Sequence, residues 1–258
     1  MFAPDLAAGN DGFSADYFAK LFAAEAGHFW FRSRNRILIW ALRRYLPQAR
    51  SLLEVGCGTG YVLAGIHEAC PELVCSGSEV FLEGLAIAQS RAPDVGFSQM
   101  SATHIPFESA FDVVGAFDVL EHVTDDERAL GQMFQAIKPG GGVLVTVPQH
   151  RILWSAVDEL ACHKRRYSRV VLVERLKAAG FSDIRTTSFV SFLLPLMLAR
   201  RWMHQDTRSL DASAELRIGR AANSVLERIM DAERFLIARG LTFPFGGSLL
   251  AFARKPRR

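Results

Sequence analysis

The amino-acid sequence predicts an α/β fold with a doubly wound, mostly parallel sheet covered by helices on both faces. Between Ser51 and about Val190, short apolar runs alternate with amphipathic segments of helical period. Such alternation is typical of parallel strands joined by crossover helices. A glycine-rich turn follows the first run, at the kind of position where these sheets bind ligands. The 258 residues, half of them hydrophobic and 22% charged, suffice for one such domain with attachments.

Residues 1–50 are expected to form a helical cap ahead of the sheet. In the first helix of this cap, one face carries Tyr17, Phe18, Leu21 and Phe22. In the second, one face carries Leu38, Ala41, Leu42 and Tyr45, and Pro47 ends the helix.

Residues 51–258 are expected to form the main domain, in which four apolar runs predict strands. These runs are Leu52–Val55, Leu73–Cys75, Val113–Val119 and Val143–Val147. The clearest helix between them has Leu130, Met133, Phe134 and Ile137 on one face. A later helix over Val171–Ala179 stops at Gly180, and another strand is expected over Phe181–Val190.

The C-terminal third is expected to hold a helical insertion, residues 191–240, before the last strand. The short apolar run Ser248–Ala253 follows Gly246 and Gly247. It predicts a final strand that returns to the sheet edge.

A glycine-rich turn is the sharpest local signal. The segment Leu52-Leu53-Glu54-Val55-Gly56-Cys57-Gly58-Thr59-Gly60 runs from a predicted strand through three alternating glycines into a helix. Glycine permits a positive φ and lets a ligand approach the backbone. The GxGxG spacing differs from the GxGxxG of dinucleotide-binding turns. About 20 residues later, Glu79 ends the next strand, where a carboxylate can accept hydrogen bonds from ribose hydroxyls.

Further motifs follow in order. Phe111-Asp112-Val113-Val114 and Phe117-Asp118-Val119-Leu120-Glu121-His122-Val123 surround the fourth strand, and Lys138-Pro139-Gly140-Gly141-Gly142 precedes the fifth. Together with Glu54–Gly60 and Glu79, this set resembles the class I S-adenosylmethionine-dependent methyltransferases over roughly residues 50–150. The resemblance implies a seven-stranded, Rossmann-like methyltransferase sheet with a reversed last strand.

The same resemblance implies S-adenosyl-L-methionine as the cofactor. Gly56, Gly58 and Gly60 would line its methionine part, Glu79 would hold the ribose, and Ser101-Ala102 would lie beside adenine. The expected cofactor-binding set is Glu54, Gly56, Cys57, Gly58, Gly60, Glu79, Val80, Ser101, Ala102 and Phe117. The alternative for the turn is a tight strand–helix connection without a ligand, and for Glu79 a solvated strand end.

Two histidines are the candidate catalytic residues. Methyl transfer from a sulfonium is an in-line displacement, so the protein supplies alignment and, where needed, a base. His122 follows the fourth strand, and His163 lies in a polar cluster after the fifth. Histidine titrates near neutral pH and suits both roles. The alternatives are a loop histidine bonded to backbone and a charged loop ahead of a helix N-cap at Ser168.

The acceptor is expected to meet aromatic and basic side chains from two segments. His28, Trp30 and Arg32 belong to an HxWFRxR-like segment that resembles one found in a branch of this family, and that could cover the site. The second group is Trp154, Arg166 and Tyr167, near His163. Aromatic packing against the sheet is the alternative for the first group.

We expect a small-molecule or lipid-like acceptor, methylated preferentially at oxygen. No Asp-Pro-Pro-Tyr or Asn-Pro-Pro-Tyr motif follows the fourth strand, and the net charge is only +3, so no nucleic-acid partner is expected. Two other functions stay open. One is a non-catalytic sensor or partner protein that binds S-adenosylmethionine, and the other is an NAD-dependent oxidoreductase.

Residues 189–202 are nearly all apolar up to a basic and aromatic edge. They are too few to span a bilayer. They could contact a membrane peripherally, line an acceptor pocket, form a homodimer surface or pack in the core. The four cysteines lack zinc-ligand spacing, so no metal is expected, and no secretory signal is visible, so a cytoplasmic location is expected.

Overall fold

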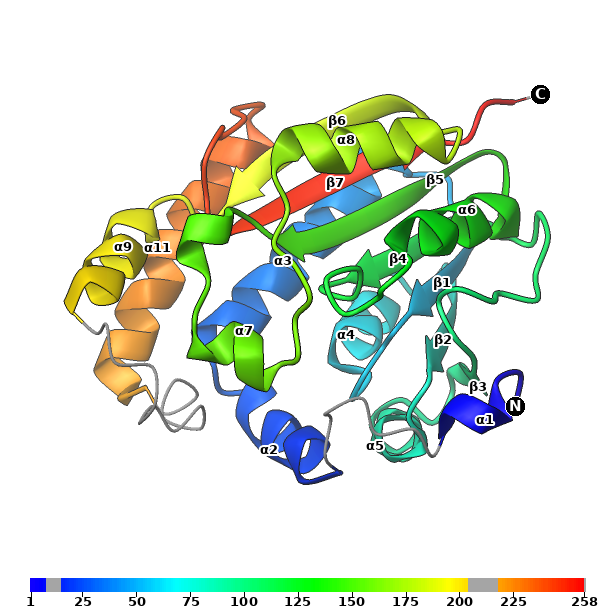
Figure 1. Cartoon of the computed structure of the whole chain (residues 1–258), viewed down its shortest axis with the longest axis horizontal. Coiled ribbons are helices and arrows are strands. Elements are labelled where there is room, and N and C mark those ends of the chain that lie inside the picture. Colours follow the sequence, from blue (N-terminus) through cyan, green and yellow to red (C-terminus); the bar gives the residue numbers. More distant parts are fainter. Residues whose placement is uncertain (8–14, 204–217, 258) are drawn as a thin grey trace.

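The computed structural model describes residues 1–7, 15–203 and 218–257. A seven-stranded sheet with the order β3-β2-β1-β4-β5-β7-β6 forms its centre (Figure 1). The strands are β1 Ser51–Val55, β2 Val74–Glu79, β3 Gly96–Gln99, β4 Phe111–Phe117, β5 Ile137–Pro148, β6 Ser182–Phe189 and β7 Ser248–Arg254. The pairs from β3 through β5 are parallel, whereas β7 runs antiparallel to both β5 and β6.

Helices cover both faces of this sheet, which confirms the predicted fold class. The described helices are α1 Pro4–Ala7, α2 Ala15–Glu25, α3 Phe29–Tyr45, α4 Tyr61–Ala69, α5 Leu82–Arg91, α6 Asp126–Ala136, η1 Arg151–Leu153, α7 Ala156–Leu160, α8 Arg169–Ala178, α9 Leu194–Met203 and α11 Arg220–Ala238. One buried apolar cluster joins α3, α4 and α11 to the sheet. A second cluster joins α6 and α8 to the opposite face.

Side-chain caps fix where the helices near the carboxyl edge of the sheet begin. Asp125 accepts a hydrogen bond from the N–H of Arg128 at the start of α6, and Ser168 accepts one from Val171 at the start of α8. Ser155 and Asp158 form a capping box on α7. These caps satisfy backbone donors that helix ends leave free, and they hold the connecting loops in place.

The expectation that the last strand returns to the sheet edge is wrong. β7 lies between β5 and β6, and β6 forms the edge. All but the last residue of β7 are buried. A strand that is apolar on both faces and paired on both sides suits the interior of a sheet, whereas an edge strand leaves a row of backbone groups unpaired.

In the chain, α9 and α11 come between β6 and β7. α11 packs against α3, where Arg32 and Arg36 form ion pairs with Glu227. The expected insertion also includes residues 204–217, which lie outside the described residues. Of the apolar run 189–202, Phe189 and Leu193 are buried, while the large apolar side chains exposed to solvent are Phe192, Leu196 and Leu198. None of the described helices combines the length and the apolar character needed to cross a membrane.

Candidate active site

The glycine turn lies at the carboxyl end of β1. Gly56, Gly58 and Gly60 all have positive φ, at 69°, 53° and 72°. A Cβ on Gly56 would meet the side chain of Val119 at 2.7 Å, and one on Gly60 would meet Ala88 at 2.9 Å. A Cβ on Gly58 would meet nothing within 4 Å. Gly56 and Gly60 therefore allow close packing, whereas Gly58 borders open space that a ligand could use.

Glu79, at the end of β2, is tied to this turn. Its Oε2 accepts a hydrogen bond from the N–H of Gly58 at 2.9 Å, and its Oε1 accepts one from Val80 at 2.7 Å. Only 8% of the residue is exposed. Burial raises the pKa of Glu79, and the backbone hydrogen bonds oppose that rise. The carboxylate is thus held at the position where a ribose diol is expected.

Glu54 and Cys57 are buried residues on either side of Gly56 in the chain. Burial raises the pKa of Glu54 to about 8, against a lowering effect from Arg34. The Oε2 atom of Glu54 accepts no hydrogen bond from the described part of the chain. Cys57 is buried and its N–H donates to the carbonyl of Ser78 at 2.8 Å. Phe117 is likewise buried, at the end of β4.

The segment expected beside adenine follows β3. Ser101 forms a turn with Thr103, whose N–H donates to the Ser101 hydroxyl oxygen at 3.2 Å. The two hydroxyl groups also lie 2.9 Å apart. Ala102 is half-buried against the apolar cluster under α6. The assignment of Ser101 and Ala102 to adenine binding stays a prediction.

Sequence reasoning missed a clamp that holds α2 on the glycine turn. The hydroxyl of Thr59 donates to both carboxylate oxygens of Glu25 at 2.7 Å. Arg91 donates to Glu25 at 2.8 Å and to the carbonyl of Thr59 at 3.0 Å. Because Glu25 lies 34 residues from Thr59 and 66 from Arg91, no local spacing reveals this contact.

The HxWFRxR-like segment forms the start of α3. His28 caps the helix, with its Nδ1 accepting from the N–H of Trp30 at 3.2 Å. Arg32 pairs with Glu227 on α11. Arg34, which was not among the predicted site residues, stacks over the Trp30 ring at 4.5 Å and pairs with Asp118 at 2.5 Å. Through Arg34 this segment reaches the carboxyl end of β4.

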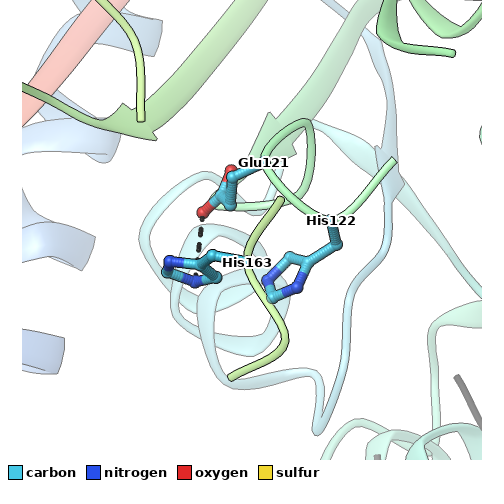
Figure 2. Close-up of side chains that lie close together, drawn as sticks. All are labelled: Glu121, His122 and His163. Atoms are coloured by element: carbon cyan, nitrogen blue, oxygen red, sulfur yellow. Dashed lines mark ion pairs between the residues drawn. The ribbon is translucent and has the colours of Figure 1, made fainter. Parts of the chain in front are cut away.

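Both predicted catalytic histidines meet beside Glu121 (Figure 2). The rings of His122 and His163 lie 4.7 Å apart at an interplanar angle of 77°. The Nε2 of His163 lies 3.9 Å from a carboxylate oxygen of Glu121. Burial, and the charge that His163 carries when protonated, lower the pKa of His122 to about 3. His122 is therefore neutral near pH 7.

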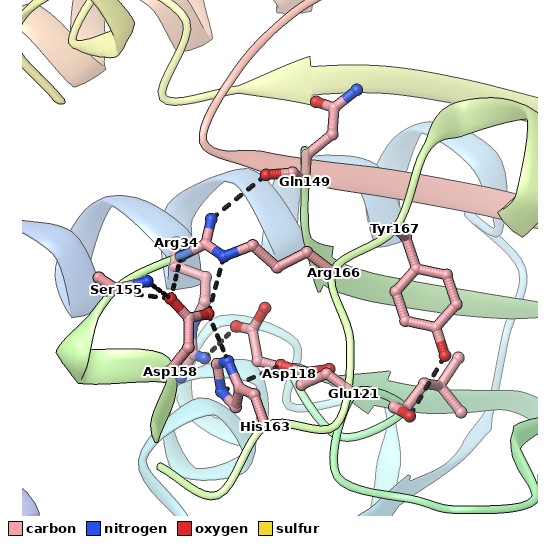
Figure 3. A network of polar contacts seen from close by, with 10 residues as sticks. Arg34, Asp118, Glu121, Gln149, Ser155, Asp158, His163, Arg166 and Tyr167 are labelled. Carbon is pink, nitrogen blue, oxygen red and sulfur yellow. Dashed lines mark hydrogen bonds and ion pairs between the residues drawn. The ribbon is translucent and has the colours of Figure 1, made fainter. Parts of the chain in front are cut away.

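A buried carboxylate, Asp158, orients His163 (Figure 3). Its Oδ1 lies 2.8 Å from Nδ1 of His163 and accepts from Nε of Arg166 at 2.7 Å. Burial opposes ionisation of Asp158, but the hydrogen bonds from His163 and Arg166 outweigh it and lower the pKa. An ionised carboxylate only accepts, so Nδ1 carries the proton and Nε2 of a neutral His163 has the lone pair.

The three residues near His163 that were predicted to contact the acceptor lie in different environments. Tyr167 is only 1% exposed, and its hydroxyl donates to Asp126 at 2.5 Å and lies 3.2 Å from the carbonyl of Leu120. The expectation that Tyr167 offers surface to an acceptor is therefore corrected: the ring belongs to the core and anchors the loop after β4. Arg166 is bound to Asp158 and to the carbonyl of Gln149, and Trp154 is half-buried.

The glycine turn, the carboxylate at the end of β2 and the strand order agree with one family. A family model described as a methyltransferase domain matches residues 22–186, more than half of the chain. The chain belongs to this family. It is a class I S-adenosylmethionine-dependent methyltransferase domain with the sheet order described above.

The two relatives described next share less than a third of their aligned residues with this chain. The methyltransferase domain is 28% identical over 158 residues to a probable S-adenosylmethionine-dependent methyltransferase of Mycolicibacterium smegmatis, a match covering 60% of each chain. It is 27% identical to ajmaline N-methyltransferase of Rauvolfia serpentina over 65% of this chain and 58% of that one. The matches thus span about three fifths of these relatives' length.

Solved structures show the same fold. The phosphoethanolamine N-methyltransferase 2 of Haemonchus contortus, in complex with S-adenosyl-L-methionine, aligns with a TM-score of 0.57 and 22% identity. The alignment covers 86% of this chain and 52% of that one.

The residues of this methyltransferase domain fit its cofactor. The turn is open beside Gly58, as a ligand lying against the backbone requires. Glu79 presents a buried carboxylate next to it. Glu79 would accept hydrogen bonds from the ribose, and the glycine turn would receive the methionine part.

Proposed function

We propose that this protein transfers a methyl group from S-adenosylmethionine to a hydroxyl oxygen of a small-molecule or lipid-like acceptor. The observation that carries the proposal is the Asp158–His163 pair. It gives the carboxyl edge of the sheet an oriented imidazole whose second nitrogen can accept a proton.

The segment after β4 connects the glycine turn to the loop that bears His163, and this connection supports an acceptor position beside the cofactor. The segment after β4 starts with Asp118, which pairs with Arg34, and Val119, which packs under Gly56. Glu121 follows two residues later, and its carbonyl accepts from the backbone N–H of Lys164 at 2.8 Å. One short stretch thus links the glycine turn to the loop that bears His163.

Proton acceptance by His163 is the central chemical step in this proposal. Bound S-adenosylmethionine supplies a methyl group on a positively charged sulfur, which is a good leaving group. Nε2 of His163 takes the hydroxyl proton while the acceptor oxygen forms its bond to the methyl carbon and the carbon–sulfur bond breaks. Asp158 stabilises the imidazolium that results, and Arg166 holds Asp158 in place.

The exposed apolar side chains of the insertion support a lipid-like acceptor. Phe192, Leu196 and Leu198 present 44%, 58% and 39% of their surface to solvent. In this proposal, residues 189–202 contact a membrane surface or an apolar acceptor. Sedimentation with liposomes tests the membrane part: binding that is lost in Leu196→Ser supports it, and a protein that stays in the supernatant opposes it.

Methyl transfer itself is tested with radiolabelled S-adenosylmethionine and a panel of acceptors. The panel should pair lipophilic alcohols and phenols with amines of matched shape. Labelling of hydroxyl compounds, lost in His163→Ala, supports the proposal. Labelling of the amines alone would reject oxygen as the target. Binding of S-adenosylmethionine without transfer to any acceptor would instead favour a sensor or partner protein.

A further inference from the structure

We propose that Glu121, His122 and His163 bind a divalent transition-metal cation such as Zn²⁺. Each residue offers one ligand atom, and these atoms all lie within 4.8 Å of one another (Figure 2). Two imidazole nitrogens and one carboxylate oxygen are a ligand set that zinc sites use. The inference goes beyond the proposed function, because a cation can bind with no acceptor present.

The carboxylate of Glu121 is the first reason. The residue is fully buried, and neither carboxylate oxygen accepts a hydrogen bond from another residue in the described part of the chain. Its ion-pair contact is the imidazole of His163 at 3.9 Å, which is too long for a hydrogen bond. Buried carboxylates are normally hydrogen-bonded, paired closely or bound to a metal. A cation between Glu121 and the two rings would satisfy these oxygens.

The surroundings of His163 are the second reason. Histidines that bind a metal usually donate their other N–H to a carboxylate or a carbonyl, which fixes the ring. Asp158 accepts from Nδ1 of His163 at 2.8 Å. Asp158 is itself held by Arg166 and by the N–H and hydroxyl of Ser155. Nε2 of His163 is left directed at Glu121, as Figure 3 shows.

The geometry favours Zn²⁺ or Co²⁺ over Mg²⁺ or Ca²⁺. The latter two cations prefer six or more oxygen ligands, whereas two of the three groups here are nitrogens. Zinc bonds of about 2.0–2.2 Å place ligand atoms roughly 3.3 Å apart, so the side chains would move closer than they are now. The fourth position of a tetrahedral site would be open to water or to an oxygen of the acceptor.

No local spacing in the sequence indicates this site, and the sequence alone led us to expect no metal. Glu121 and His122 are adjacent, and His163 arrives from the loop before α8. A cation on Nε2 of His163 would occupy the lone pair that accepts a proton in the proposed function. The metal-loaded and the metal-free protein would then differ in whether His163 can accept the proton of the acceptor hydroxyl.

Metal titration of the full chain tests the inference. Protein stripped with a chelator is titrated with Zn²⁺ by calorimetry and with Co²⁺ by visible absorption. We expect one site, a Kd below about 10 μM, and Co²⁺ bands of a four-coordinate complex. Glu121→Gln and His163→Gln should each weaken Zn²⁺ binding at least tenfold. His67→Ala, which removes a histidine on α4 outside the cluster, should leave it unchanged.

The outcomes separate this site from the proposed function. No stoichiometric binding, or equal binding by wild type and both cluster variants, overturns the metal site. The same preparations are titrated with S-adenosylmethionine, and each variant that retains this binding counts as folded. Should one cluster variant fail to fold, the other decides. Absence of metal binding together with intact methyl transfer removes the metal site alone, and methyl transfer absent in both the metal-loaded and the metal-free protein removes the proposed function.

Discussion

Glu79 Oε2 accepts a hydrogen bond from the backbone N–H of Gly58 at 2.9 Å, which joins the end of β2 to the turn after β1. The same carboxylate accepts from Val80 through its other oxygen. The side chain is therefore oriented by backbone groups on both sides, beside the one glycine of the turn that borders open space. A group oriented in advance loses little conformational entropy when a ligand binds.

Glu79→Ala should weaken binding of S-adenosylmethionine. It removes the carboxylate that would accept from the ribose, and it frees the N–H of Gly58. We expect at least a tenfold rise in Kd by calorimetry, about 1.4 kcal/mol. Glu83→Ala, an exposed glutamate at the start of α5, is the matched control. An unchanged Kd in Glu79→Ala would exclude this residue from the cofactor site.

Gly58→Ala and Gly240→Ala form a pair that separates backbone strain from ligand exclusion. Both glycines have positive φ, 53° and 99°, and a Cβ on either would meet nothing within 4 Å. Each substitution should therefore cost about 1 kcal/mol of folding stability. Calorimetry should show weaker S-adenosylmethionine binding in Gly58→Ala alone. Equal affinities in the two variants would mean that the space beside Gly58 is not used by the ligand.

Glu54 should make stability fall as pH rises. Burial raises the pKa of its carboxyl from 4.5 to about 8, so the folded protein holds a proton that the unfolded chain releases above its ordinary pKa. The favourable contribution is present below pH 4.5 and is lost as pH rises through about 8. Urea unfolding at a mildly acidic and a mildly alkaline pH measures it. Between these two pH values, the free energy of unfolding of the wild type should fall by about 2 kcal/mol more than that of Glu54→Gln. Equal decreases in the two proteins would contradict a protonated Glu54 in the folded state.

His163→Ala and Asp158→Asn should lower turnover while leaving cofactor affinity nearly unchanged. The first removes the proton acceptor, and the second removes the carboxylate that fixes its tautomer. General-base catalysis contributes about 10²–10⁴-fold, so kcat should fall within that range. The test compares kcat with the Kd for S-adenosylmethionine, using an acceptor found in the screen. Full turnover in His163→Ala would remove this residue from the chemistry.

The proximity of the glycine turn and Glu79 could be predicted from sequence because it follows from local spacing. The glycines, Glu54 and the strand before them are consecutive, and Glu79 follows one strand–helix unit later. In a parallel sheet that spacing brings both to the same edge. The alternating strands and helices predicted the fold class for the same reason. The position of β7 was missed because pairing partners of an antiparallel strand are set by the whole sheet.

The acceptor half could not be predicted in the same way, because long-range contacts define it. Arg34 and Asp118 are 84 residues apart, and Tyr167 reaches Asp126 across 41 residues. Tyr167 is an aromatic residue in a charged segment, which made it a candidate for acceptor binding, but its ring is enclosed by the core. Only the tertiary packing tells a buried anchor from a side chain that faces a ligand.

The most direct test of the central claim is parallel calorimetric titration with S-adenosylmethionine, S-adenosylhomocysteine and NAD. The geometry of Gly58 and Glu79 predicts one binding site in the micromolar range for both adenosyl sulfur compounds and no heat of binding with NAD. Binding of NAD, or no binding of either adenosyl compound, would contradict the assignment of this turn as a methyl-donor site.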